Sequence, residues 1–185
     1  MIKTNIASTN RRMRRRRLFI SYSHLDGKWV ARIRTMLSPL VGEDGVDVWD
    51  DDRLAPGSEW RMEIRRAIGT ANVALLLVSP SYLASQFIKD EELLPLLRAA
   101  RERGVIILWV LVSHCLYKRT AIAEFQAAHS VSKPLDSLPI ARRNEEILHI
   151  AEAVEFALQQ SHDSQKRNVS PMPAKISLRR AKNGA

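Results

Sequence analysis

The chain has 185 residues, of which 45% are hydrophobic and 6% aromatic, and its formal net charge is +9. This apolar fraction excludes a wholly disordered chain, and the length suits one domain with a core of its own. The single cysteine, Cys115, excludes an intrachain disulfide framework and a cysteine-based zinc module, and is typical of a reducing compartment.

The positive charge is concentrated at the two ends of the chain. Residues 1–17 hold seven basic residues and no acidic one, and residues 161–185 carry a net charge of +5. Between them, residues 18–160 hold 16 basic and 19 acidic residues, a net charge of −3. We therefore predict a folded domain over 18–160 between two disordered basic arms. A nucleic acid or an anionic membrane would be bound only through these arms.

Strand and helix patterns alternate through the first half of the predicted domain. The apolar run 18–22 predicts a strand, and apolar residues at helical spacing over 29–40 predict the helix that follows. A short strand is expected at 46–49, a polar loop at 50–57, and a helix at 60–68 with one apolar face.

Two uniformly apolar runs predict buried strands in the second half. These are residues 73–78 and 105–112, and such runs are typical of parallel strands covered on both faces. Both are much shorter than the roughly 18–20 residues that span a bilayer. A helix between them is expected to end near Gly104.

The last unit of the pattern is less regular than the others. Residues 120–126 look helical, a strand is expected to begin at Val131, and residues 144–158 predict an amphipathic helix. The alternation predicts an α/β fold, namely an open, flavodoxin-like sheet of about five parallel strands with helices on both faces. In such sheets the functional site lies beyond the carboxyl ends of the strands.

Several common site types are excluded by the sequence. The seven glycines do not cluster, so neither a P-loop nor a dinucleotide-binding loop is present. No acidic pair follows the first strand, as a response regulator requires, and no two histidines have metal-binding spacing. The acidic run 50–52 lacks the alternating ligands of a calcium loop, so we expect no metal site.

Six short motifs follow one another along the chain, namely Phe19–His24, Val48-Trp49, Asp52–Gly57, Trp60–Ile64, Val78–Ser85 and Glu92-Leu93. This is the order in which Toll/interleukin-1 receptor (TIR) domains carry such motifs. Lys133-Pro134-Leu135 is a weaker match to a downstream motif of the same domains. Residues 17–160 therefore resemble a TIR domain, and their style is closer to bacterial members than to animal receptor adaptors.

The resemblance implies an enzymatic activity, because many TIR domains cleave the bond between nicotinamide and ribose in NAD+. The products would be nicotinamide with ADP-ribose or, through a cyclase activity, a cyclic isomer. Nicotinamide leaves as a neutral molecule and needs no protonation, so one carboxylate near the ribose can suffice. NAD+ would be the substrate, and no cofactor is implied.

Two adjacent glutamates are candidates for that carboxylate. One form of the family motif places the glutamate four residues after an aromatic, which selects Glu91 after Phe87; another places it in a Glu-Leu-x-Pro-type run, which selects Glu92. Adjacent helix positions differ by about 100°, so the two cannot share one role. We favour Glu92, because the regular helix is expected to begin near 90–92 with Pro95 in its first turn.

Residues near the first two strand ends are candidates for substrate binding. Turn capping is the alternative role for those of the first loop, and core packing, which we favour, is the alternative for Trp60. The candidates are Ser21, Tyr22 and Ser23 for the nicotinamide or ribose, Arg53 for a phosphate, and Trp60 for stacking on a base. Asp50, at the start of the second loop, is a further candidate.

The loop that carries Asp52, Arg53, Leu54, Pro56 and Gly57 resembles the segment through which TIR domains contact one another. Self-association and contacts with other TIR proteins are therefore implied. One hypothesis is an NAD+-cleaving enzyme activated by self-association, in bacterial defence or virulence, located in the cytoplasm or secreted into a host cell. The alternative is a non-enzymatic adaptor that recruits other TIR domains.

Overall fold

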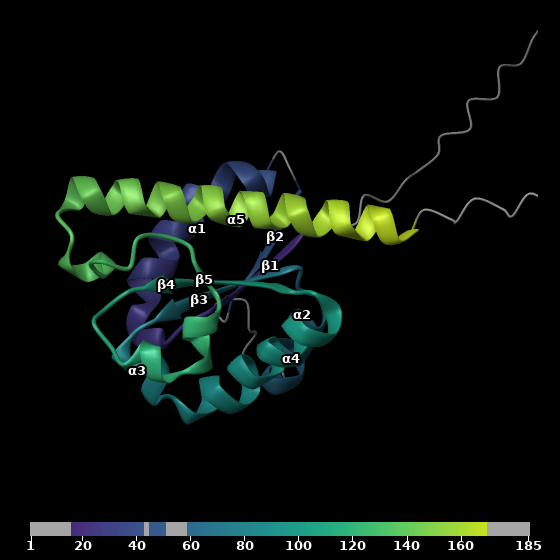
Figure 1. The fold of residues 1–185 in the computed structure, drawn as a ribbon, viewed down its shortest axis with the longest axis horizontal. Coiled ribbons are helices and arrows are strands. Elements are labelled where there is room, and N and C mark those ends of the chain that lie inside the picture. The colour runs from purple at the N-terminus through teal and green to yellow at the C-terminus, as the bar shows by residue number, and fades with distance from the viewer. Residues whose placement is uncertain (1–15, 43–44, 51–58, 170–185) are drawn as a thin grey trace, which may run out of the picture.

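A computed structural model of the chain describes residues 16–42, 45–50 and 59–169 (Figure 1). A π-helix, η3 (Ile88–Leu93), joins two of its α-helices. The strands are β1 (Arg17–Ser21), β2 (Asp47–Trp49), β3 (Val73–Val78), β4 (Ile106–Leu111) and β5 (Gln126–Ala127). The α-helices are α1 (Gly27–Gly42), α2 (Trp60–Thr70), α3 (Pro80–Ala84), α4 (Leu94–Arg103) and α5 (Ile140–Val169).

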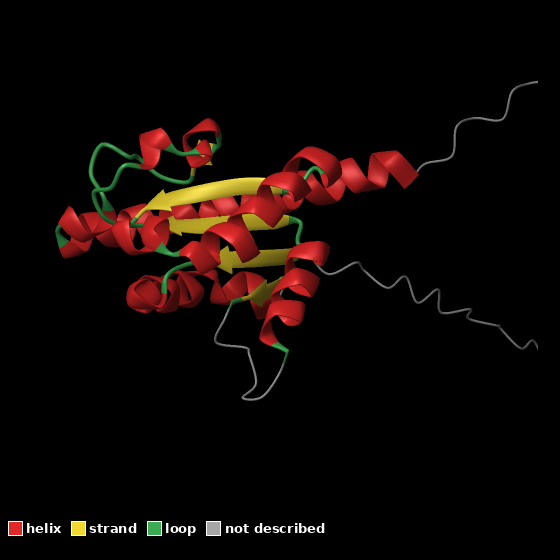
Figure 2. Cartoon of the chain, turned by 90° about the horizontal axis from the view of Figure 1, so that it is seen from below, coloured by secondary structure: helices red, strands yellow, loops and turns green. Residues whose placement is uncertain are grey.

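The five strands form one parallel sheet in the order β2-β1-β3-β4-β5, which confirms the predicted α/β fold class. All six residues of β3 are buried, because this strand lies at the centre of the sheet between two covered faces. The strand arrows point the same way in Figure 2, so the carboxyl ends of the strands share one edge.

Alternate side chains of each strand enter two separate cores, as the period of two requires. Ile20 and Leu75 pack against α1 and α5 on one face. Phe19 and Leu76 pack against α2 and α4 on the other face. Figure 1 shows the same separation, with α5 above the sheet and α2 and α4 below it.

The helix before β4 ends where the sequence predicts. Gly104 follows α4 with a φ of 71°, in the left-handed region that glycine adopts without steric cost. Its backbone N–H donates to the carbonyl oxygens of Ala99 and Ala100, which closes the last turn of the helix.

The last unit differs from the prediction. The helix expected at 120–126 is a 3₁₀ turn (Ala121–Glu124) followed directly by β5, so the strand expected to begin at Val131 is wrong. Strand β5 pairs with only two residues of β4, and so short a strand leaves no alternating pattern in the sequence.

Helix α5 is longer than the pattern at 144–158 predicts. It ends at Val169, so the expected disordered tail from 161 is helical over its first residues. The apolar stripe stops near residue 158, and the helix continues on residues such as Gln159 and Gln160, which have good helix propensity. Figure 1 shows this end of α5 extending past the sheet. No helix within the described residues is both long and apolar enough to cross a bilayer.

A buried histidine joins the end of β4 to α5. The Nε2 atom of His129 accepts a hydrogen bond from the backbone N–H of Leu111 at 3.0 Å, so its proton lies on Nδ1. That atom is 3.7 Å from the Oε2 atom of Glu146. Burial lowers the pKa of His129, and the nearby Glu146 offsets only part of this effect.

This lowered pKa predicts a pH-dependent loss of stability. Above the ordinary histidine pKa of about 6.5 both states are neutral; as pH falls below it, the unfolded chain takes up a proton that the folded state resists. We expect the wild type to lose more unfolding free energy than His129→Gln between pH 7 and pH 5. Urea denaturation at both pH values measures it. His162→Gln, at a partly exposed histidine, should behave like the wild type, and equal losses in all three proteins would contradict the prediction.

Candidate active site at the carboxyl edge of the sheet

The π-helix η3 determines which of the two candidate glutamates faces the sheet. The backbone N–H of Leu94 donates to the carbonyl of Lys89, five residues earlier, so the turn holds one residue more than an α-turn. Pro95 has no N–H to bond to residue 91 in a regular helix, and it lies in the first turn of α4, as predicted. The regular helix begins at Leu94, later than the expected 90–92.

Glu92 points into the protein and is 1% exposed. Its Oε2 atom accepts a hydrogen bond of 2.5 Å from the hydroxyl of Ser21, the last residue of β1. This distance is typical of a hydroxyl that donates to an ionised carboxylate. A buried carboxylate therefore lies at the carboxyl edge of the sheet, where open α/β folds carry their sites.

A second hydroxyl extends this contact. The phenolic oxygen of Tyr82, from α3, lies 2.9 Å from the Ser21 Oγ atom. Ser21 has one hydroxyl hydrogen and gives it to Glu92, so the hydrogen between Ser21 and Tyr82 must come from Tyr82. Burial, with a smaller contribution from Glu92, raises the pKa of Tyr82 above its ordinary value, so the phenol keeps this hydrogen at neutral pH.

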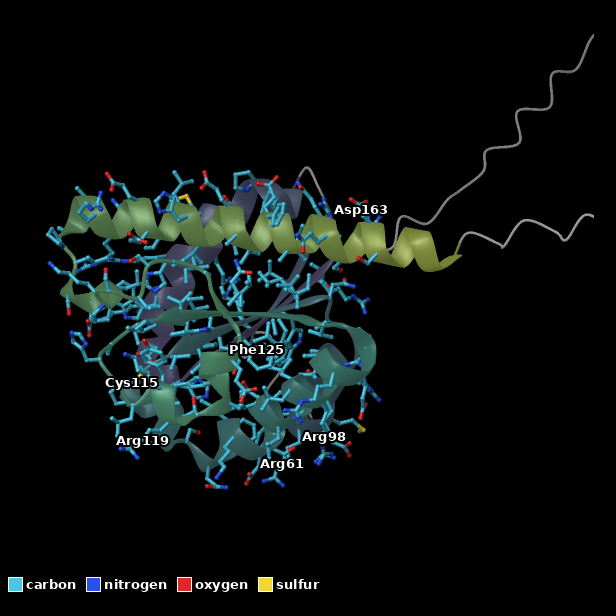
Figure 3. All side chains as sticks on the ribbon, viewed as in Figure 1. Arg61, Arg98, Cys115, Arg119, Phe125 and Asp163 are labelled. Atoms are coloured by element: carbon cyan, nitrogen blue, oxygen red, sulfur yellow. The ribbon has the colours of Figure 1, made fainter. Side chains whose placement is uncertain are left out.

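Glu91 faces α2 instead of the sheet. Its carboxylate lies 3.0 Å from the guanidinium of Arg65 and 3.9 Å from that of Arg61. Arg61 lies on the side of the molecule away from α5 (Figure 3). The two adjacent glutamates therefore have different environments, one an exposed ion-pair network and the other a buried chain of hydroxyl groups.

A further polar pair fixes the start of α3, the helix that carries Tyr82. Ser79 follows β3 and caps α3, because its Oγ atom accepts the Tyr82 backbone N–H at 3.0 Å. The same hydroxyl donates to the Oδ2 atom of Asp26 at 2.6 Å. Burial raises the pKa of Asp26, against the opposing effect of the Ser79 hydrogen bond.

Three of these residues were not among the predicted site residues, namely Asp26, Ser79 and Tyr82. A signal for two of them is present in the sequence, because Ser79-Pro80 is the usual cap-plus-first-residue pair at a helix start, and Tyr82 follows within that first turn. Asp26 has no such signal, since its partner is distant in the sequence.

The other residues predicted for the first loop do not reach Glu92 in the same way. Tyr22 is buried, with its ring edge-on to that of His24 at 6.0 Å between centroids. Ser23 precedes a 3₁₀ turn (His24–Asp26) without a capping bond from its side chain, so the capping expected there comes only from its backbone carbonyl, which accepts the N–H of Asp26. Of this trio, only Ser21 contacts the carboxylate.

The two described candidates beside the second loop, Asp50 and Trp60, contact different residues. Asp50 is buried and forms an ion pair with Arg34 at 3.3 Å. Core packing of Trp60 is wrong, because its side chain is 40% exposed and its ring lies 4.7 Å from that of Phe87. Trp60 is the first residue of α2, a full turn before Ile64, where this face becomes buried. Arg53 and the interface loop 52–57 lie outside the described residues.

No group of three or more histidine, cysteine, aspartate or glutamate side chains suited to a metal ion occurs within the parts of the chain that the structure describes. At the end of β1, the group that Glu92 forms with its neighbours is a buried carboxylate with two hydroxyl groups in series.

Comparison with protein-family models shows to which family the chain belongs. The family model described as "TIR domain" matches residues 18–143. The chain belongs to the TIR domain family. The matched range extends from β1 to the start of α5, so it contains the sheet, η3 and both glutamates.

Individual relatives share limited sequence identity with this TIR domain. The uncharacterised protein y4lF of Sinorhizobium fredii (strain NBRC 101917 / NGR234) is 26% identical over 140 residues, which cover 76% of this chain and 43% of that protein. The chain thus spans less than half of its relative.

Among solved structures, the TIR domain of the Toll-related receptor TRR-2 from Hydra magnipapillata is 19% identical with a TM-score of 0.43, over 60% of this chain and 82% of that one. The TIR domains of the activated Roq1 resistosome, a complex that directly recognises the pathogen effector XopQ, are 17% identical with a TM-score of 0.45, over 84% of this chain and 99% of that one.

Proposed function

We propose that this TIR domain is an NAD+ glycohydrolase whose catalytic carboxylate is Glu92. The observation that carries the proposal is the 2.5 Å hydrogen bond from Ser21 to a carboxylate that is almost wholly buried at the carboxyl edge of the sheet. Glu91 lacks such an environment, because two arginines of α2 bind it at the surface.

The proposed reaction needs little from the protein besides this carboxylate. The bond between the ribose C1′ atom and the nicotinamide nitrogen breaks, and its electron pair leaves with nicotinamide, which becomes neutral. Positive charge develops on the ribose, and Glu92 stabilises it while accepting hydrogen bonds from the ribose hydroxyls. Water then adds to C1′ and loses a proton, which gives ADP-ribose; attack by a group of the same molecule gives a cyclic isomer. A negative charge in a dry site is most effective in this role.

The burial of Glu92 implies that the described conformation is a resting state. A ribose can reach a carboxylate that is 1% exposed only after neighbouring atoms move. We infer that self-association supplies the free energy for this movement, because a contact made only by the open state shifts the equilibrium toward it. Such regulation suits a role in bacterial defence or virulence signalling.

The test of the proposed function is the release of nicotinamide at increasing protein concentration. Purified protein is incubated with NAD+ over a wide concentration range, with and without a crowding polymer, and nicotinamide is measured by chromatography. We expect the rate per molecule to rise steeply with concentration, because opening is coupled to association.

The alternative is a non-enzymatic adaptor, and the same burial of Glu92 favours it, since a closed carboxylate also serves as a structural group. If the protein associates at high concentration, as light scattering would show, yet releases no nicotinamide, the adaptor is the correct function.

A further inference from the structure

The carboxylate of Glu92 is held by a chain of hydroxyl groups that runs in one direction. Tyr82 donates to Ser21, and Ser21 donates to Glu92, with oxygen separations of 2.9 Å and 2.5 Å. Tyr82 is 2% exposed and Ser21 is 0% exposed, so no bulk water competes for these bonds. Each bond polarises the next one, and the effect is strongest in a dry interior.

The three residues come from different elements, so this series of hydrogen bonds forms only in the folded protein. Ser21 ends β1, Tyr82 lies in α3, and Glu92 lies in η3. The position of the phenol is itself fixed, because Ser79 caps the Tyr82 backbone N–H and is bound in turn to Asp26. The donor end of the chain is therefore held in place before any substrate arrives.

We propose that Tyr82 and Ser21 are positioning residues that keep Glu92 ionised and fix the orientation of its carboxylate. Neither acts on the substrate; both act through the carboxylate. The catalytic part of this inference rests on the proposed function. The part that concerns the ionisation of Glu92 does not, and can be measured in the absence of NAD+.

Several charged side chains also lie on and beside η3. Among the described residues, Arg61 and Arg65 of α2 are directed to Glu91. On η3 itself, Lys89 is exposed, and Asp90 accepts a hydrogen bond from Gln86. No acidic or basic residue lies in the first turn of α4, which reads Leu-Pro-Leu-Leu. The Ser21 hydroxyl contacts Glu92 directly, and the Tyr82 hydroxyl acts on it through Ser21.

The direction of the expected change follows from the charge of the acceptor. A donor that bonds to an ionised carboxylate lowers its pKa, so removal of the donor raises it. Ser21→Ala removes the direct donor, and Tyr82→Phe removes only the group that orients and polarises that donor. We therefore expect the pKa of Glu92 to rise in the order wild type, Tyr82→Phe, Ser21→Ala, by about one unit for Tyr82→Phe.

The experiment measures this pKa in two ways. The first is a carbon NMR titration of protein labelled in its glutamate carboxyl groups, with the Glu92 signal identified by its absence in Glu92→Gln. The second is the pH profile of kcat/KM for nicotinamide release. Its acid limb should move to higher pH in both variants, so Tyr82→Phe loses about tenfold well below the pKa and little above it.

Tyr117→Phe is the matched control, because it removes a tyrosine hydroxyl whose ring packs against Trp109 in the same core layer, at 4.7 Å between centroids. It should leave both readouts at their wild-type values. Melting temperatures will show whether each variant folds. If Tyr82→Phe does not fold, Ser21→Ala provides the test.

Two negative results have different meanings. If the Glu92 titration of both variants coincides with that of the wild type, the hydroxyl chain has only a structural role and the inference is wrong. If the titration shifts as expected but the wild type releases no nicotinamide at any pH, the hydroxyl chain stands and the proposed function fails.

Discussion

Glu92→Gln should abolish nicotinamide release, whereas Glu91→Gln should leave it within severalfold of the wild-type rate. The glutamine side chain has nearly the same shape, and its carbonyl oxygen still accepts from Ser21, so the variant removes the charge and little else. Loss of a single preorganised electrostatic group costs about 10²–10³ in kcat in other enzymes. For a site with only one carboxylate we expect at least the upper end of that range.

The comparison with Glu91→Gln makes this experiment specific. Both substitutions neutralise one carboxylate in the same turn of helix, so they change the net charge and the helix sequence equally. Glu91→Gln removes only the ion pairs with Arg61 and Arg65, which at the surface are worth up to about 1 kcal/mol of stability. Single-turnover assays at one pH and one protein concentration give the two rates. Equal losses in the two variants would remove the assignment of catalysis to Glu92.

The second large effect concerns stability. Phe19→Ala should lower the free energy of unfolding by about 3–5 kcal/mol, because it removes a fully buried ring from the core between the sheet and helices α2 and α4. Phe19 is 1% exposed and stacks on Trp49 of the edge strand β2, with 4.9 Å between ring centroids. The substitution therefore leaves a cavity and also loosens the edge strand, which has only one neighbour in the sheet.

Phe156→Ala serves as the control for this change, since the same atoms are removed from a side chain of α5 that is 62% exposed. Its cost should be within about 0.5 kcal/mol, as for most surface positions. Urea denaturation gives both values, with the slope of the transition checked for constancy. A loss below about 1 kcal/mol for Phe19→Ala would show that the core tolerates the cavity.

The strands with the most buried positions were the most predictable from sequence. Strands β3 and β4 lie inside the sheet and are covered on both faces, so their sequences contain no polar position that would blur the pattern. The same physical reason explains the failure at β5. An edge strand of two residues, paired only with Leu108 and Trp109, imposes almost no pattern on the chain.

The candidate site was predictable only in part. The order of the motifs indicated Glu91 and Glu92 and the end of β1, but a choice between the glutamates needs the rotation of each helical residue about the axis. The π-helix changes that rotation, and apart from Pro95 nothing in the local sequence announces it. Tyr82 was missed because its role depends on a contact with Ser21, which is 61 residues away.

The extra residue in η3 also affects how sequences of this family are compared. The π-helix at residues 88–93 accommodates one residue more than an α-helix with the same number of turns. A chain without this inserted residue therefore has its inward-facing acid one residue closer to the preceding aromatic. An ungapped alignment of two such chains would place Glu91, not Glu92, in the column of that acid. A correct alignment of the two sequences therefore needs a gap inside the helix, where gaps are seldom placed.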